Sequence, residues 1–260
     1  FKATGGSSEI SCGGIFGTLN QGTLTNCTNL ASGTVVASGD SGSNFEFAGI
    51  TGSTSGYATT ITNCDNYAAV TQTKASRGTT QIGGIVGYAY TFGTIDGCDN
   101  HGTVTYVGTA AGGQSSVGGV VAYSRVRAGE GNTATIKNCA NYADQDWSKA
   151  VGKSSFQGGV IGYCRSDESG TGAYENLKNV ANITFGGTFT TPYFGGLAGF
   201  LGTTSVIDGG VCYGNMKGIG LSGKMGFCAG VARTDTCYLK DVQVGGSLVL
   251  KQNQGESSFD

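Results

Sequence analysis

Hydrophobic and polar positions along this chain alternate over short segments, without the 3.6-residue period of a helix. The clearest segment is a block of two small residues followed by an aliphatic one. Residues two positions to either side of the aliphatic are Gly or Ala in nearly every copy, which predicts a tightly packed face inside a narrow coil. The second Gly recurs every 34 to 40 residues in seven copies: Gly13-Gly14-Ile15, Ala48-Gly49-Ile50, Gly83-Gly84-Ile85, Gly118-Gly119-Val120, Gly158-Gly159-Val160, Gly195-Gly196-Leu197 and Ala229-Gly230-Val231.

A second block follows each of the first four and places Asn on both sides of a Cys, except that Gly97 stands before Cys98 in the third copy. Asn tolerates the left-handed region of backbone space, so the block predicts a turn, and stacked copies would align their amides into ladders. The fifth copy is aligned with Val180 in place of the Cys, and the last two copies are degraded. The clear copies are Leu24–Asn29, Ile61–Asn66, Ile95–Asn100, Ile136–Asn141 and Leu177–Asn182.

A third, weaker block of β-branched residues completes each repeat, as in Thr34-Val35-Val36 and Thr103-Val104-Thr105. Three short strands and three turns account for about 35 residues. We therefore predict an all-β parallel solenoid of about seven coils over residues 1–242, with 243–260 as a C-terminal cap or tail. The rival fold is a seven-bladed propeller, whose blades need about 40–45 residues.

Composition narrows the function classes. The chain has 260 residues, 49 of them Gly, with 12% charged residues and a net charge of −2. No basic surface is available to neutralise phosphates, so we expect neither nucleic acid nor direct membrane insertion. The N-terminal residues do not resemble a signal peptide, so the targeting segment of an exported protein would be absent from this chain.

The first two blocks together, as in Ile82–Tyr88 followed by Gly93–Val104, resemble the GLUG motif repeats of secreted and surface proteins of bacteria, notably gut Bacteroidetes. The resemblance covers nearly the whole chain, is clearest in the third copy and is blurred in the last two. It implies a right-handed β-helix that is secreted or exposed on the outer cell surface. Such repeats accompany adhesins and large peptidases, and no catalytic residues transfer from the family.

The nine Cys are interpreted as buried apolar residues. Four of them, Cys27, Cys64, Cys98 and Cys139, occupy one repeat position. Neighbours in such a column have a Cα spacing of about 4.8 Å, at the short end of the range for a disulfide. Paired spacings such as C-x2-C, which zinc sites use, do not occur.

Sequence templates for catalysis do not match either. His101 is the only histidine, and its slot in other copies holds Tyr67, Tyr142 or Ile183, which indicates a surface turn. We expect no catalytic residue, no metal and no cofactor. The alternative is a polysaccharide lyase or hydrolase on a β-helix, which rests on fold analogy alone; its candidate acids are Asp96 with Asp99, Asp144 with Asp146, and Asp167 with Glu168, and its candidate bases are Arg125, Arg127 and Arg165.

A binding face is the better supported reading. Four positions after the second Gly, successive coils place Tyr88, Tyr123, Tyr163 and Phe200, opposite in parity to the buried aliphatic. We expect an outward aromatic row suited to sugar rings or a protein partner. Stacking that merely stabilises the solenoid is the competing reading.

The fourth coil carries the longest departures from the repeat. These insertions hold Arg125, Arg127 and the sole Trp, Trp147. Insertions in solenoids map to loops that often bind ligands, so these residues join the candidate site. The leading hypothesis is an extracellular adhesion or interaction module that binds glycan or a host or neighbouring-cell surface protein; a structural spacer that presents other domains is the second.

Overall fold

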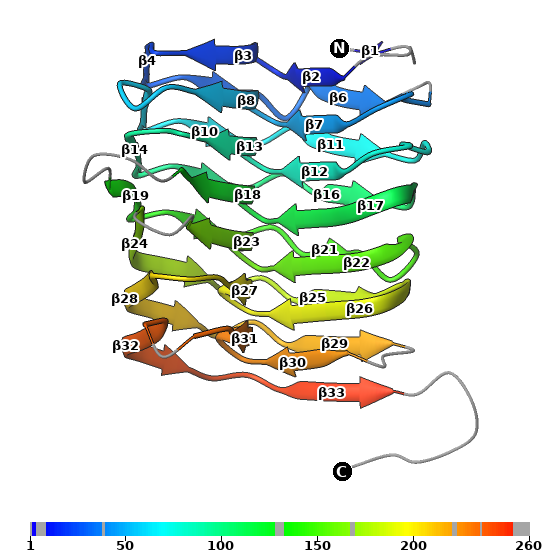
Figure 1. The fold of residues 1–260 in the computed structure, drawn as a ribbon, viewed down its shortest axis with the longest axis vertical. Coiled ribbons are helices and arrows are strands. Elements are labelled where there is room, and N and C mark those ends of the chain that lie inside the picture. The colour runs from blue at the N-terminus through cyan, green and yellow to red at the C-terminus, as the bar shows by residue number, and fades with distance from the viewer. Residues whose placement is uncertain are drawn as a thin grey trace.

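The computed structural model describes residues 2–3, 9–37, 40–127, 133–166, 170–219, 223–234 and 236–251. These residues form parallel strands and no helix, so no helix among them is long or apolar enough to span a membrane. The strands stack into a single solenoid, with the N-terminal coil at the blue end and the C-terminal coil at the red end of Figure 1. The predicted parallel β-solenoid is confirmed, and its handedness stays a prediction.

Five sheets, named A to E, run along the solenoid. Sheet B holds β2 (Ile10–Gly13), β7 (Phe45–Ala48), β12 (Thr80–Gly83), β17 (Thr109–Gly118), β22 (Val151–Gly158), β26 (Thr188–Gly195) and β30 (Lys224–Gly226). Sheet C holds β3 (Phe16–Asn20), β8 (Thr51–Ser55), β13 (Val86–Tyr90), β18 (Val121–Val126), β23 (Ile161–Ser166), β27 (Ala198–Leu201) and β31 (Ala229–Ala232). Each of these two sheets has seven strands, so about six turns separate the first strand from the last.

The other sheets complete each coil. Sheet D holds β4 (Thr23–Thr25), β5 (Thr28–Asn29), β9 (Thr60–Thr62), β10 (Asp65–Asn66), β14 (Thr94–Asp96), β15 (Asp99–Asn100), β19 (Thr133–Lys137), β20 (Ala140–Asn141), β24 (Thr171–Asn179), β28 (Ser205–Cys212) and β32 (Tyr238–Val244). Sheet A holds β1 (Lys2–Ala3), β6 (Thr34–Ala37), β11 (Ala69–Gln72) and β16 (Val104–Tyr106), and sheet E holds β21 (Gln145–Asp146), β25 (Ile183–Gly186), β29 (Met216–Ile219) and β33 (Leu248–Lys251). Strand β32 pairs with β28 and β33 pairs with β29, so the solenoid continues past the expected boundary at residue 242. Residues 252–260 of the expected tail lie outside the described part.

The small-small-aliphatic blocks form the bend between sheets B and C. A Cβ atom at Gly84 would lie 2.1 Å from the carbonyl oxygen of Gly119 on the next coil and 2.3 Å from Cγ of Asn100 across the interior. Gly119 stands in the same relation to Asn141, at 2.4 Å. The bend therefore needs glycine because the backbone of the next coil and an interior asparagine fill the space that a side chain would occupy.

The interior asparagines form the ladder that the sequence predicts. From coil to coil, each Nδ2 donates to the next Oδ1 at 3.2, 2.9, 3.0 and 3.0 Å through Asn29, Asn66, Asn100, Asn141 and Asn179. Within its own coil the Asn100 amide also donates to the Gly102 carbonyl at 2.8 Å. Buried amides with this many partners favour one register between coils, because a shifted register leaves them unsatisfied.

The predicted turn before each Cys is also confirmed. Asn26, Asn63, Asn138 and Asn176 have φ between 51° and 55°, and Gly97 takes the same place with φ 61°. Asn tolerates this left-handed conformation better than other residues with a side chain. The short Asn–Cys–x–Asn block therefore bends the chain at one point in each coil.

The fifth copy of this block is displaced from its predicted alignment. Ala140 pairs with Lys178 and Asn141 with Asn179, so Leu177 occupies the Cys position, and Val180 does not. The prediction was wrong because asparagines at 176, 179 and 182 permit two alignments three residues apart. Burial decides between them, since Leu177 is fully buried and Val180 is half-exposed.

Candidate functional site

The predicted aromatic row exists as a stack on sheet C. The rings of Tyr88 and Tyr123 have centroids 5.0 Å apart, and those of Tyr123 and Tyr163 are 4.8 Å apart and nearly parallel at 4°. Phe200 meets Tyr163 edge to face at 5.1 Å. The outward parity of these residues is confirmed, since they belong to a cluster separate from the main core.

The expected exposure of this row is wrong. Tyr123, Tyr163 and Phe200 are buried, and Tyr88 is half-buried. Sheet B contributes two more rings. The centroid of Phe156 lies 4.4 Å from that of Tyr163, and the centroid of Tyr193 lies 5.2 Å from that of Phe200. Because the bend folds sheets B and C toward each other, their outward side chains close over the row and cover its ring faces.

The two arginines of the candidate site lie beside this row. Arg125 stands over the Tyr90 ring at 5.6 Å and hydrogen-bonds the Tyr88 hydroxyl, and Arg127 Nη1 donates to the Tyr90 hydroxyl at 3.2 Å. Burial raises the pKa of Tyr88 to about 12, so its hydroxyl stays protonated. Both guanidinium groups therefore contact the tyrosines at the edge of the aromatic row.

Trp147 is the clearest correction. It is fully buried, its Nε1 donates to the Val104 carbonyl at 2.7 Å, and its ring lies 5.8 Å from that of Phe185. The insertion that carries it folds inward and fills the core of the fourth coil. A buried indole with a satisfied N–H contributes to packing and is not accessible to a ligand.

A different aromatic column lies exposed at the turn of sheet D. Tyr67, His101 and Tyr142 stack with centroids 4.5 and 4.8 Å apart and planes within 6°. Tyr67 is 42% and Tyr142 38% exposed, and Tyr213, further along the same position, is 49% exposed. The sequence already placed His101 with Tyr67 and Tyr142 at a surface turn. In the fifth coil, however, Val180 takes this position instead of the predicted Ile183, because its backbone N–H bonds the Asn141 carbonyl as that of Tyr142 bonds Asn100.

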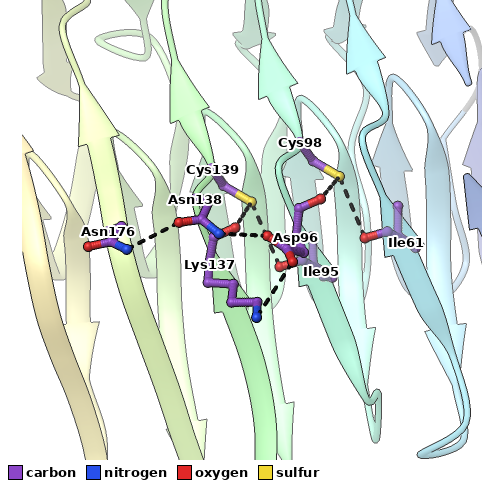
Figure 2. A network of polar contacts seen from close by, with 8 residues as sticks. All are labelled: Ile61, Ile95, Asp96, Cys98, Lys137, Asn138, Cys139 and Asn176. Carbon is purple, nitrogen blue, oxygen red and sulfur yellow. Dashed lines mark hydrogen bonds and ion pairs between the residues drawn. The ribbon is translucent and has the colours of Figure 1, made fainter. Parts of the chain in front are cut away.

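Charged residues flank the exposed column on sheet D. Figure 2 shows Asp96, which accepts a hydrogen bond from Asn138 Nδ2 at 2.8 Å and forms an ion pair with Lys137 at 3.6 Å. Asp99 accepts from the Ala140 backbone N–H at 3.0 Å, and partial burial raises its pKa. These carboxylates satisfy groups on the next coil, so each is part of the bonding between coils.

A hollow lies on sheet E, the sheet that follows the exposed column along the chain in each of the last three coils. It has a volume of about 520 Å³ and is lined by Asn182, Ile183, Thr184, Asn215, Met216, Lys217, Ser247 and Val249. Ile183 and Met216 lie in the core beneath it, Val249 is 38% exposed, and its exposed rim carries amides and an ammonium group. Sequence reasoning missed the hollow, since it depends on the stacking of three coils, the last two of which have degraded repeat copies.

Hydrogen bonds between coils hold the polar rim in place. The Asp144 carboxylate accepts from the backbone N–H of Asn182 at 2.7 Å and from its Nδ2 at 3.1 Å. Asn182 Oδ1 accepts from the Asn215 N–H at 3.1 Å, and Asn215 Oδ1 accepts from the N–H and hydroxyl of Ser247. Tyr213 precedes Asn215 by two residues, so the exposed aromatic position and the rim share one corner of the solenoid.

Glu46 is a buried acid that the sequence did not single out. It is only 2% exposed in the corner between sheets B and C, where Ser11 donates to it and Ser53 hydrogen-bonds it. Desolvation raises the pKa of this carboxyl to about 7, against the Ser11 hydrogen bond, which lowers it. Glu46 occupies an outward-facing position of β7. It is buried because sheets B and C face each other at this corner.

Metal ligation has no candidate in the described part of the chain, where no three His, Cys, Asp or Glu side chains gather closely enough to hold an ion. Of the predicted acid pairs, Asp146 accepts from the N–H and hydroxyl of Ser148. Residues 167 and 168, the third pair, lie outside the described residues.

Comparison with known proteins agrees with the repeat. The family model described as the GLUG motif matches residues 78–105, which include β12, the bend at Gly84, β13, β14 and β15. No curated protein and no solved structure gives a significant match to the chain. The chain is therefore a β-solenoid repeat protein that carries the GLUG motif.

Proposed function

We propose that this chain is a non-catalytic interaction module of an exported bacterial surface protein, and that it binds glycan at the corner formed by the hollow on sheet E and the exposed aromatic column. The hollow carries this proposal: amide, hydroxyl and ammonium groups lie beside the exposed apolar side chain of Val249. Sugars offer hydroxyls to such polar groups and an apolar ring face to carbon atoms beneath them.

Aromatic residues at the same corner support the glycan reading. Three tyrosines there have large exposed rings that end in a hydroxyl group: Tyr67, Tyr142 and Tyr213. Such side chains suit a ligand that has both polar groups and apolar faces. Lys178 lies 5.2 Å from the Tyr142 ring centre and adds a cationic group to the corner. A surface protein of a host or neighbouring cell is the second partner class, because tyrosine also anchors protein interfaces.

The hydrogen bonds that the carboxylates accept support a non-catalytic role. A glycosidase needs two carboxyl groups free to act across one bond. Asp96, Asp99 and Asp144 instead each accept hydrogen bonds from the neighbouring coil. The spacer function remains the alternative, and the continuous hydrogen-bonded ladders favour it because they make the solenoid stiff.

Binding to a glycan array and to soluble polysaccharides tests the proposal. The test variant is Asn215→Ala with Lys217→Ala, which alters the rim of the hollow, and the matched control is Lys240→Ala, which removes an exposed lysine on sheet D. We expect at least a tenfold loss of affinity in the rim variant and none in the control, with unchanged circular dichroism in both. No glycan binding by the wild type, or equal binding by the rim variant, would overturn the proposal; in the first case the spacer or a protein partner replaces it.

A further inference from the structure

Four cysteines form a column through the first four coils of sheet D. Thr28 pairs with Asp65 and Thr25 with Thr62, so Cys27 lies directly beside Cys64. Cys98 and Cys139 continue the column at the same turn. All four are free thiols in the structure.

The thiols of the column point the same way along the solenoid. Cys64 Sγ donates toward the Thr62 carbonyl at 3.3 Å and toward the Leu24 carbonyl of the preceding coil at 3.7 Å. Cys98 and Cys139 repeat this arrangement, as Figure 2 shows. The Cys64 backbone N–H donates to Cys98 Sγ at 3.5 Å, so neighbouring members of the column are in contact.

Residues paired between adjacent coils have Cα atoms about 4.8 Å apart, within the range of about 4.4–6.8 Å that disulfides span. The turn residues Asn26 and Asn63 precede both cysteines, outside the strand interior. A disulfide here therefore requires little movement of the ladders on either side.

Access separates Cys27 from the rest of the column. Cys27 is half-exposed, while Cys64, Cys98 and Cys139 are fully buried. The pKa values of the Cys27, Cys64 and Cys98 thiols are all raised, that of Cys64 chiefly by its interaction with Cys98 and by burial, so exposure and not acidity sets Cys27 apart. An external oxidant therefore meets Cys27 first, and Cys64 is the thiol nearest to it.

We propose that Cys27 and Cys64 form a disulfide that joins the first two coils when the chain meets a disulfide oxidant outside the cytoplasm. The Cys27 thiolate attacks one sulfur of the oxidant disulfide, forms a mixed disulfide and releases one thiol of the oxidant. The Cys64 sulfur then gives up its proton and attacks the Cys27 sulfur, which forms the Cys27–Cys64 bond and releases the second thiol. Two cysteines are oxidised, one disulfide is reduced, and the two protons end on the released thiols.

The bond would link two adjacent coils covalently. Coils of a solenoid contact only their neighbours, so such a link adds directly to the interface between these two coils. The disulfide closes a loop around the 36 residues between Cys27 and Cys64, and it limits the unfolded conformations of the first coil.

Peptide mapping of the full chain tests this inference. The reduced protein is incubated with oxidised glutathione, its remaining thiols are alkylated in denaturant, and it is digested without reductant. We expect a peptide pair joined through Cys27 and Cys64 and lighter by two hydrogen atoms, with Cys98 and Cys139 alkylated. Cys27→Ser should abolish the linked pair, while Cys12→Ser, the control, should retain it.

Two results would overturn the inference. One is a Cys27 that stops as the glutathione mixed disulfide while Cys64 stays alkylated, and the other is Cys27 linked to a second chain. Thermal unfolding gives an independent reading: oxidation should raise the midpoint of the wild type by at least about 2 °C, and leave Cys27→Ser unchanged. The experiment uses no glycan, so its failure would leave the proposed binding function untouched.

Discussion

The side chain of Asn100 lies against Gly84, so that a Cβ atom added to Gly84 would stand 2.3 Å from Asn100 Cγ. The two residues come from different blocks of the repeat, and their contact joins the bend to the asparagine ladder. The first prediction follows from this contact. Gly84→Ala should cost about 1–3 kcal/mol or more of folding free energy, because the Asn100 amide and the Gly119 carbonyl cannot both move away.

Urea unfolding measures this cost. Gly113→Ala is the matched control, since the nearest atom to its new Cβ would be 3.3 Å away. A Gly84→Ala protein as stable as the control would contradict the described bend.

The asparagine ladder gives the second prediction. Asn100→Leu removes the acceptor of Asn66 Nδ2 and the donor to Asn141 Oδ1, both of which are buried. Asn66 Nδ2 keeps the Ala68 carbonyl and Asn141 Oδ1 keeps Gln145, but the buried Gly102 N–H loses its acceptor, and an orphaned polar group costs about 1–3 kcal/mol. We expect a loss of that size or greater in urea unfolding, whereas Asn26→Leu at the exposed turn should lose less than Asn100→Leu.

The third prediction concerns pH. The pKa of Glu46 is about 7 in the folded chain and about 4.5 as its ordinary value, so folding favours the protonated carboxyl. Stability from this group is therefore full below about pH 4.5 and is lost as pH rises through 7. Its size is of the order of 3 kcal/mol. The nearby titratable groups are Glu9 and Tyr88, and the Glu9 charge pushes the Glu46 pKa in the same direction.

Urea unfolding at pH 5 and pH 8 checks the sign. The wild type should be less stable at pH 8, and Glu46→Gln should reduce the difference between the two pH values. An unchanged difference in Glu46→Gln would assign the pH dependence to other groups.

Trp147 supplies the fourth prediction. As the only tryptophan, it reports its own surroundings by fluorescence, and full burial predicts blue-shifted emission that acrylamide quenches weakly. Trp147→Phe should lose about 1–3 kcal/mol, because the Val104 carbonyl loses its donor and a cavity opens. Glycan binding by this variant should equal that of the wild type, and red-shifted native emission would contradict the buried position.

The fifth prediction compares two tyrosines. Tyr123→Ala removes a buried ring stacked on both sides and should cost about 3 kcal/mol. Tyr142→Ala removes an exposed ring and should cost about 1 kcal/mol or less. Binding should show the reverse order, with the larger loss at Tyr142, so a larger binding loss in a folded Tyr123 variant would favour the aromatic row of sheet C as the site.

Local features of the fold could be predicted because they depend on single residues. The requirement for glycine at Gly84 and the left-handed turn at Asn63 follow from backbone sterics, and both recur often enough to be recognised. Parity along a strand likewise placed Tyr123 outside the main core. The register of the fifth coil could not be decided, because Asn179 fits the pattern in two alignments.

The candidate site depends on how sheets face each other, which no single repeat encodes. Tyr163 points outward from its own strand, but Phe156 of the facing sheet covers it. Glu46 is buried for the same reason. Trp147 lies in an insertion that folds into the core, because a large apolar ring gains more from burial than from exposure.

The exposed column of Tyr67, His101 and Tyr142 places one ring in each of three successive coils, at a regular spacing of 4.5 to 4.8 Å. A polymer whose own subunits repeat at a similar spacing would contact several coils at once, and each contact after the first would form at a high effective concentration. If the proposed glycan binding holds, such a surface would distinguish chains by length. Short oligomers would dissociate readily, while long ones would stay attached through many weak contacts.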